Sequence, residues 1–247
     1  MPDLSDAPRM YRTLRRLLPH VVNPYFPLTV LGLENVPCDR PAILAANHLS
    51  FVDSIVLPIN VPRPVYFLGK SDYWDSWRTR WFFTGTGVVP VYRDGGDRGA
   101  ASLRAGVEIL RQGDLLGIYP EGTRSPDGRL YRGKTGPARM ALAAEVEIVP
   151  CAVLGSDIGM PTGTRWPRRM PITVHYGEPM SLAAYTGREN DPGALRDATR
   201  EIMQAIQHLS GQEYVDMYAE TVKGVARRSG PSSTGVDAQR RRERRAS

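Results

Sequence analysis

Short runs of apolar residues, separated by glycine and proline, alternate along this chain with segments whose apolar residues recur at helical spacing. Such an alternation is typical of proteins in which helices cover a parallel or mixed sheet. The apolar runs predict seven strands, at residues 28–32, 41–46, 65–68, 87–92, 115–119, 148–154 and 172–176. We therefore expect an α/β protein: a single three-layer α/β/α domain with a central, mostly parallel or mixed sheet.

Two segments carry the period of a helix that packs one face on a core. Residues 98–112 are followed by Gly113, a residue that suits a helix end, and their apolar face consists of Ala100, Leu103, Val107 and Leu110. Residues 192–209 follow Asp191 and begin with Pro192, which favour the N-cap and the first helical position. Their apolar face consists of Leu195, Thr199, Ile202, Ile206 and Leu209.

Residues 9–22 predict a short amphipathic helix with an unusually basic border. Its stripe is Tyr11, Leu14, Leu17, Leu18 and Val21, flanked by Arg9, Arg12, Arg15 and Arg16. A basic amphipathic helix suits an anionic membrane surface, although a first helix packed on the protein's own core has the same pattern. Pro19 is expected to end or bend this helix early. Residues 73–83, with Trp74, Trp77 and Trp81 on one helical face, are a second candidate for an interface or for core packing.

Charge is distributed unevenly along the 247 residues, which carry a net charge of +6. Residues 223–247 hold eight basic and two acidic side chains, so they account for all six positive charges and leave residues 1–222 neutral. This segment is rich in Ser, Gly and Arg, a composition typical of disorder. The predicted division is an N-terminal helix at 1–24, one domain at 25–222 and a disordered basic tail at 223–247.

The chain shows neither a secretory signal nor an apolar run of the roughly eighteen residues that a membrane span needs, so any membrane contact is expected to be peripheral. Cys38 and Cys151 have no metal-type spacing and lie among apolar residues, which predicts buried, reduced thiols in a cytosolic protein. The four histidines are scattered and show no ligand spacing, so no metal site is expected.

The first candidate for chemistry is His48, which follows the strand at 41–46 and precedes Asp53 by five residues. Five residues correspond to about 140° around a regular helix, so the two side chains can meet only if His48 stands before the helix and folds back. An imidazole oriented by a carboxylate is suited to take a proton from an alcohol. The alternative is a histidine that caps the helix and a solvated aspartate. Ser50 lies between them, but without a GxSxG elbow a serine nucleophile is weakly supported.

The second candidate is the segment from Tyr119 to Gly128, YPEGTRSPDG, which follows the strand at 115–119. Pro120 and Gly122 predict a tight turn, and Arg124 presents a planar fork suited to a phosphate. Glu121 could anchor this loop through backbone amides or through Arg124. Lys70 and Arg93 end two further strands, so three cations could converge on one anion at the carboxyl edge of the sheet. Three solvated surface cations are the alternative.

Four segments, NHLSFVD, GVVPVYR, YPEGTRS and IVPCAVLG, resemble in order and spacing the four blocks of the glycerolipid acyltransferase family. The resemblance runs from about residue 30 to 180. The family's histidine and aspartate fall on His48 and Asp53, its Pro-Glu-Gly-Thr-Arg block on residues 120–124, and its phosphate-contacting arginine on Arg93. The chain departs from the pattern after the third block, where RGKTGPARMAL replaces a Lys-x-Gly stretch, and the role of Lys134 stays unassigned.

The resemblance implies an enzyme that moves a fatty acyl group from acyl-CoA or acyl-carrier protein to the free hydroxyl of 1-acyl-glycerol 3-phosphate (lysophosphatidic acid), giving phosphatidic acid for phospholipid biosynthesis. His48 and Asp53 would be catalytic, with no acyl-enzyme intermediate and no cofactor. Free amides after His48 would stabilise the oxyanion. The acceptor phosphate would be bound by Lys70, Arg93, Glu121, Gly122, Thr123 and Arg124. The expected location is cytoplasmic, on the inner face of the cell membrane.

Two alternatives remain open at this point. The same fold and chemistry could serve another acceptor, such as glycerol 3-phosphate or another lysophospholipid. A non-catalytic protein that binds membranes or nucleic acid through its Arg-rich tail is a different class. The neutral charge of residues 1–222 argues against nucleic acid as a partner.

Overall fold

The computed structural model describes residues 9–70, 88–91, 98–161, 164 and 166–229. Their centre is a seven-stranded sheet with the order β1-β8-β7-β2-β5-β3-β4. The strands are β1 (Leu28–Leu31), β2 (Ala42–Ala46), β3 (Val65–Lys70), β4 (Val88–Val91), β5 (Leu115–Ile118), β7 (Glu147–Leu154) and β8 (Ile172–Tyr176). Neighbouring strands run parallel except β7 and β8. All seven strands predicted from the apolar runs are present, in a mixed sheet.

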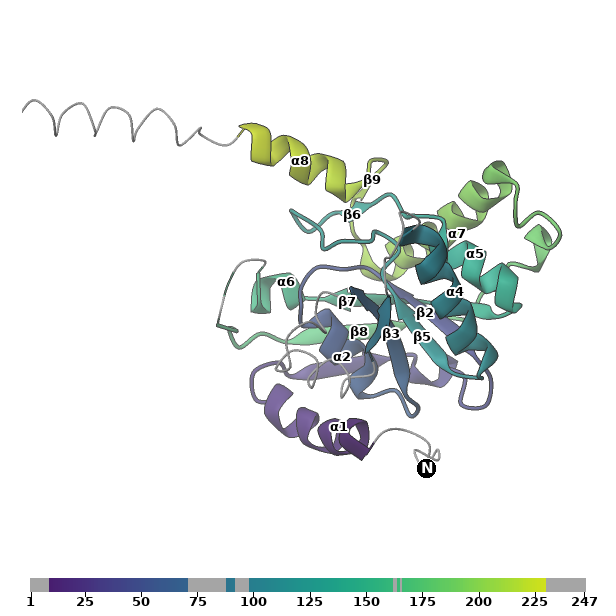
Figure 1. The fold of residues 1–247 in the computed structure, drawn as a ribbon. Coiled ribbons are helices and arrows are strands. Elements are labelled where there is room, and N and C mark those ends of the chain that lie inside the picture. Colours follow the sequence, from purple (N-terminus) through teal and green to yellow (C-terminus); the bar gives the residue numbers. More distant parts are fainter. Residues whose placement is uncertain (1–8, 71–87, 92–97, 162–163, 165, 230–247) are drawn as a thin grey trace, which may run out of the picture.

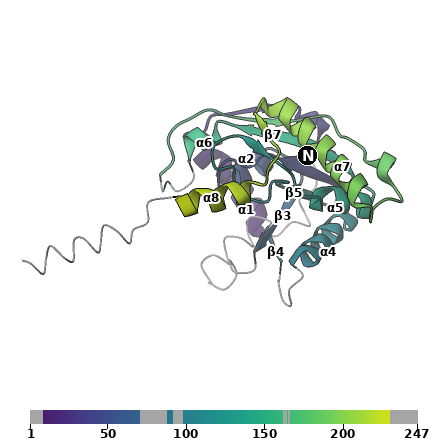
Figure 2. The same cartoon turned by 90° about the horizontal axis from the view of Figure 1, so that it is seen from above.

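Helices cover both faces of this sheet, as Figures 1 and 2 show. One face carries α4 (Arg98–Arg111), α5 (Gly136–Ala144) and α7 (Pro192–Ser210), and the other carries α1 (Arg9–Val22) and α2 (Asp53–Ile59). The central strand β2 is buried on both sides, and its side chains alternate between the two cores. Ile43 and Ala45 join the α4–α5–α7 core, whereas Leu44 joins the α1–α2 core. The predicted three-layer α/β/α arrangement is confirmed.

Short elements complete the fold. They are η1 (Leu33–Asn35), α6 (Ser156–Gly159), η3 (Ala183–Tyr185) and a two-stranded parallel sheet of β6 (Leu130–Tyr131) and β9 (Tyr214–Val215). The last described element is α8 (Ala219–Ser229). Its extent corrects a prediction. Residues 223–229 were expected to belong to the disordered tail, and they lie in this helix. Residues 230–247 lie outside the described residues.

The helix α1 runs through Pro19 to Val22, so the proline does not end it early. Val22 is buried against the core and Leu18 packs beside it, whereas Leu17 is 55% exposed. The C-terminal half of α1 therefore packs on the domain and still presents an apolar residue to solvent. Within the described ranges, no helix combines the length and apolar character that crossing a bilayer requires. The tryptophan segment at 73–83 lies outside the described residues.

The cysteine prediction is half right. Cys151 in β7 is buried, and burial raises the pKa of its thiol well above the usual range. Cys38 is exposed, because it lies in the turn between η1 and β2 rather than in the core. Both thiols are free.

Candidate active site

The backbone around the candidate histidine is fixed by its neighbour Asn47, the residue that follows β2. Asn47 is fully buried, and its amide nitrogen donates to the carbonyl of Val153 at 3.0 Å and to Oε1 of Gln212 at 2.8 Å. Its amide oxygen accepts from the Val153 N–H at 2.7 Å. A buried amide with both ends bonded holds its surroundings rigidly. The carboxyl ends of β2 and β7 are thus joined immediately before His48.

His48 and Asp53 form the pair that the spacing predicts. The helix α2 begins at Asp53, so His48 stands before it in the loop, and His48 Nδ1 lies 2.9 Å from Asp53 Oδ2. The Asp53 carboxylate is fully buried, whereas the His48 side chain keeps 16% of its surface exposed. With Nδ1–H donating to the carboxylate, the Nε2 lone pair is left as the base.

The same carboxylate oxygen organises the loop between the two residues. Asp53 Oδ2 also accepts from the backbone amides of Leu49, at 2.6 Å, and Ser50, at 2.8 Å. These amides were expected to be free for an oxyanion, and the structure shows instead that they bind Asp53. Oδ1 of Asp53 is buried and makes no hydrogen bond with any described residue. One oxygen therefore fixes both the imidazole and its loop.

The neighbouring Ser50 has no free hydroxyl for a nucleophilic role. Its side chain is fully buried, and Oγ donates to the carbonyl of Met160 at 2.7 Å. The structure thus argues against Ser50 as a nucleophile. Among the described residues, no group of three or more His, Cys, Asp or Glu side chains is placed to hold a metal ion.

An aromatic ring supports the imidazole from one side. The ring of Tyr119, which follows β5, stacks on His48 with centroids 3.9 Å apart and planes 11° apart. Its hydroxyl lies 3.1 Å from Oγ of Ser54. Burial, followed by the negative charge of Asp53, raises the pKa of Tyr119 well above its ordinary value, so the hydroxyl stays protonated. The sequence marked Tyr119 only as a motif position, since stacking leaves no periodic signal.

Glu121 joins the histidine loop to the YPEGTRS loop. Its carboxylate is 1% exposed and accepts from the backbone amides of His48, at 3.1 Å, and Tyr131, at 3.0 Å. The Ser125 amide donates in turn to the His48 carbonyl at 2.6 Å. Both backbone groups of His48 are therefore bonded to this loop. The geometry thus confirms the expected anchoring of the loop by Glu121 through backbone amides, and its buried carboxylate does not serve as the phosphate contact that we also expected.

The carboxylate of Glu121 occupies an unusual electrostatic environment. Burial raises the pKa of Glu121 from 4.5 to about 7; the amides of Tyr131 and His48 oppose the rise, and the charge of Asp53 adds to it. A proton on this carboxyl would compete with one of the two amide contacts. We therefore expect the junction between the two loops to respond to pH near neutrality.

Gly122 and Lys134 meet where the turn closes. Gly122 has φ of 72°, and a Cβ built on it would lie 2.9 Å from Cε of Lys134. The left-handed backbone conformation favours glycine here. The Lys134 amide donates to the Pro120 carbonyl at 2.8 Å, and its ammonium pairs with Glu220 of α8 at 2.8 Å. Lys134, which the sequence left unassigned, joins this loop to the C-terminal helix.

A second lysine at this loop, Lys223, comes from α8, and the sequence did not identify it as a site residue. The ammonium of Lys223 donates to Oγ1 of Thr123 at 2.9 Å and to the carbonyl of Arg124. The Arg124 side chain is partly buried, and its guanidinium makes no hydrogen bond or ion pair with the described residues. Lys70 ends β3 but its side chain is not described, and Arg93 lies outside the described residues. Among the described residues, Arg124, Lys134 and Lys223 are therefore cations that lie at this loop.

Comparison with known proteins is consistent with this arrangement. The model of the family described as acyltransferase matches residues 27–154, just over half of the chain, and includes His48, Asp53 and the whole YPEGTRS loop. The chain belongs to the acyltransferase family.

Among curated relatives, the chain is 33% identical over 144 residues to a chloroplastic 1-acyl-sn-glycerol-3-phosphate acyltransferase of Arabidopsis thaliana, covering 58% of this chain and 40% of that one. An enzyme of the same name from Bacillus subtilis is 27% identical over 205 residues, or 82% of this chain and 98% of that one. The chain spans only 40% to 53% of the length of the plant and algal relatives that it matches.

The fold also has a solved counterpart. The crystal structure of the 1-acyl-sn-glycerophosphate acyltransferase PlsC from Thermotoga maritima matches with a TM-score of 0.59 at 23% identity, covering 83% of this chain and 85% of that one. This match shows that the two chains share a fold.

Proposed function

We propose that this protein transfers a fatty acyl group from an acyl thioester to the free hydroxyl of 1-acyl-glycerol 3-phosphate, which yields phosphatidic acid. The observation that carries the proposal is the 2.9 Å contact between His48 Nδ1 and Asp53 Oδ2, made in a loop whose backbone is bonded to the loop of Arg124. A general base and a free guanidinium are thereby held in one framework. The names of the relatives from Arabidopsis and Bacillus support the acceptor.

The proposed reaction uses the remaining nitrogen of the imidazole. Nε2 of His48 takes the hydroxyl proton while the hydroxyl oxygen attacks the thioester carbonyl, and Asp53 stabilises the imidazolium. The tetrahedral intermediate then collapses, the carbon–sulfur bond breaks, and the imidazolium returns its proton to the thiolate. The products are an ester and a free thiol. No acyl-enzyme is formed, which agrees with the buried hydrogen bond of Ser50.

The acceptor phosphate is assigned to Arg124, with Arg93 and Lys70 as further candidates. The guanidinium of Arg124 is not engaged with described residues, and its backbone is held by Lys223. An unengaged guanidinium, on a loop that is bonded to the backbone of the base, would bind the phosphate and bring the neighbouring hydroxyl to Nε2. The donor is acyl-CoA or acyl-carrier protein.

We propose a cytoplasmic location with peripheral attachment to the inner face of the cell membrane. The exposed Leu17 and Arg16 of α1 support this placement, since an apolar residue beside a cation suits an anionic lipid surface. The lysolipid acceptor would be found at that surface.

The test is an acceptor panel assayed with one acyl-CoA and scored by product mass. Lysophosphatidic acid, glycerol 3-phosphate, lysophosphatidylcholine and monoacylglycerol are compared with wild-type protein, with His48→Ala and with His208→Ala, an exposed histidine of α7 that serves as control. We expect phosphatidic acid from wild-type and His208→Ala protein only. Near-normal turnover by His48→Ala would refute the mechanism, and a preference for glycerol 3-phosphate would move the proposal to the other acceptor.

A further inference from the structure

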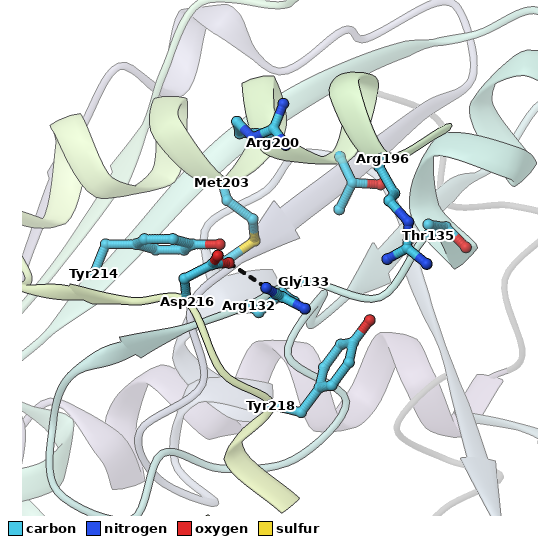
Figure 3. Close-up of a pocket in the computed structure, with 10 residues that line it drawn as sticks. Arg132, Gly133, Thr135, Arg196, Arg200, Met203, Tyr214, Asp216 and Tyr218 are labelled. Atoms are coloured by element: carbon cyan, nitrogen blue, oxygen red, sulfur yellow. Dashed lines mark hydrogen bonds and ion pairs between the residues drawn. The ribbon is translucent and has the colours of Figure 1, made fainter. Parts of the chain in front are cut away.

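A cavity separate from His48 lies between α7, the segment before α5, and the chain that connects β9 to α8 (Figure 3). Its volume is about 110 Å³, enough for one phosphate group. Its lining is dominated by arginine and hydroxyl side chains. The lining residues on which the argument rests are Arg132, Thr135, Arg196, Arg200, Asp216 and Tyr218.

The lining is strongly basic. Its lining residues include three arginines and a single carboxylate, that of Asp216, which pairs with Arg132 at 2.8 Å. The guanidinium of Arg132 also lies 5.5 Å from the ring centroid of Tyr218, so it is fixed from two sides. Arg200 is paired with Asp197 at 2.7 Å on the outer surface of α7.

Of the three lining arginines, Arg196 has no counter-ion among the described residues, and it stands one helical turn before Arg200. Like charges four residues apart destabilise a helix, and a bound anion would remove that cost. In Figure 3 the guanidinium groups of Arg196 and Arg132 and the hydroxyl of Tyr218 face the same space, with Thr135 beside them. Guanidinium and hydroxyl donors that converge in this way are suited to phosphate oxygens.

The position of the cavity relative to the reaction centre suggests which phosphate it binds. One wall is the segment 132–135, and Lys134 of the same segment contacts Gly122 and donates its amide N–H to the Pro120 carbonyl of the YPEGTRS loop. The cavity thus adjoins the YPEGTRS loop, and neither His48 nor Asp53 lines it. A coenzyme A thioester carries its phosphates at the far end of a long pantetheine arm from the reacting carbonyl, which requires a phosphate site away from the base.

We propose that this cavity binds a phosphate of the coenzyme A portion of the acyl donor, an assignment that rests on the proposed function. An acyl-carrier protein is less well matched, because it would present carboxylates on a convex surface and the site is a small concave one. The acceptor phosphate is already assigned to Arg124 in the proposed function. The cavity therefore gives the donor an anchor of its own, and it selects a coenzyme A thioester.

The test measures binding and turnover separately. Calorimetry would follow coenzyme A, 3′-dephospho-coenzyme A and inorganic phosphate binding to wild-type protein, to Arg196→Gln and to Arg188→Gln, a control whose arginine pairs with Asp191 outside the cavity. We expect Arg196→Gln to weaken coenzyme A binding roughly tenfold, the loss typical of a charge-assisted contact. The KM for acyl-CoA should rise similarly, with the KM for the acceptor and kcat within about twofold of wild type.

Loss of the Arg196 effect with dephospho-coenzyme A would place the 3′-phosphate in the cavity, and an equal effect would place the diphosphate there. Coenzyme A binding that does not respond to Arg196→Gln would overturn the proposal. The proposal would also be overturned if the enzyme used acyl-carrier protein as donor and did not bind coenzyme A. The proposed acyl transfer would still hold in that case. Arg196-dependent binding without phosphatidic acid synthesis would leave the cavity assigned and refute the proposed function instead.

Discussion

Glu121→Gln provides a quantitative test of how the histidine loop and the YPEGTRS loop are joined. Burial raises the pKa of Glu121 from 4.5 to about 7, so the folded protein holds this proton more tightly than the unfolded chain. The stability gained from that proton is fully present below the unfolded pKa and is lost as the pH rises through the folded value. Between about pH 5 and pH 8 the loss amounts to about 2.5 kcal/mol, from 1.36 kcal/mol per pKa unit.

Urea denaturation of wild-type and Glu121→Gln protein at several pH values between these limits would measure the effect. Glutamine cannot titrate, so we expect the free energy of unfolding of wild type to fall relative to the variant by about 2.5 kcal/mol as the pH rises. Other titrating groups are common to both proteins and cancel. Glu178→Gln, at an exposed glutamate, is the matched control and should follow wild type. Parallel curves for wild-type and Glu121→Gln protein would refute the buried, proton-binding state of this carboxyl.

Three further substitutions test the site. Asp53→Asn should fold, because the amide oxygen can accept from the three donors at Oδ2 while the NH₂ takes the position of the unbonded Oδ1. We expect kcat to fall by about 10² to 10⁴ because the negative charge is lost. A wild-type kcat would show that the charge is dispensable. Arg124→Gln should raise the KM for lysophosphatidic acid about tenfold and leave that for monoacylglycerol unchanged, and an equal change for both would remove Arg124 from the phosphate role. Lys223→Met should raise the acceptor KM about fivefold at nearly constant kcat, with partial recovery in Lys223→Arg; an unchanged KM would make the contact with Thr123 incidental.

The sheet was predictable because its strands are local apolar runs, and β2 shows why. Every residue from Ala42 to Ala46 is buried, since helices cover both faces, so the strand appears in the sequence as a continuous apolar segment. The geometry of His48 and Asp53 was predictable for a different reason. If the two side chains were to meet, the helical angle between positions five apart required a histidine that precedes the helix, and α2 does begin at Asp53.

The incorrect predictions concern residues whose structure depends on contacts between distant parts of the chain. Residues 223–229 were assigned to the tail because basic side chains begin there. The helix α8 is nevertheless held by Lys134 and Glu220, 86 positions apart, and by Lys223 and Thr123, 100 positions apart. Composition cannot report such contacts, so the tail was predicted to begin too early. Glu121 was placed with the phosphate ligands for the same reason, because its burial depends on how two loops pack.

The contacts between these loops imply that the base and the phosphate anchor act as one unit. The N–H and the carbonyl of His48 both bond to the loop 119–125, and that loop is fastened to α8 through Lys134 and Lys223. Movement of Arg124 would therefore be transmitted to the imidazole. The acyltransferase model ends at residue 154, yet the C-terminal helix that completes this framework begins at Ala219. A variant shortened before Ala219 would keep every motif residue, and it should still lose the fixed spacing between Arg124 and His48 on which the proposed reaction depends.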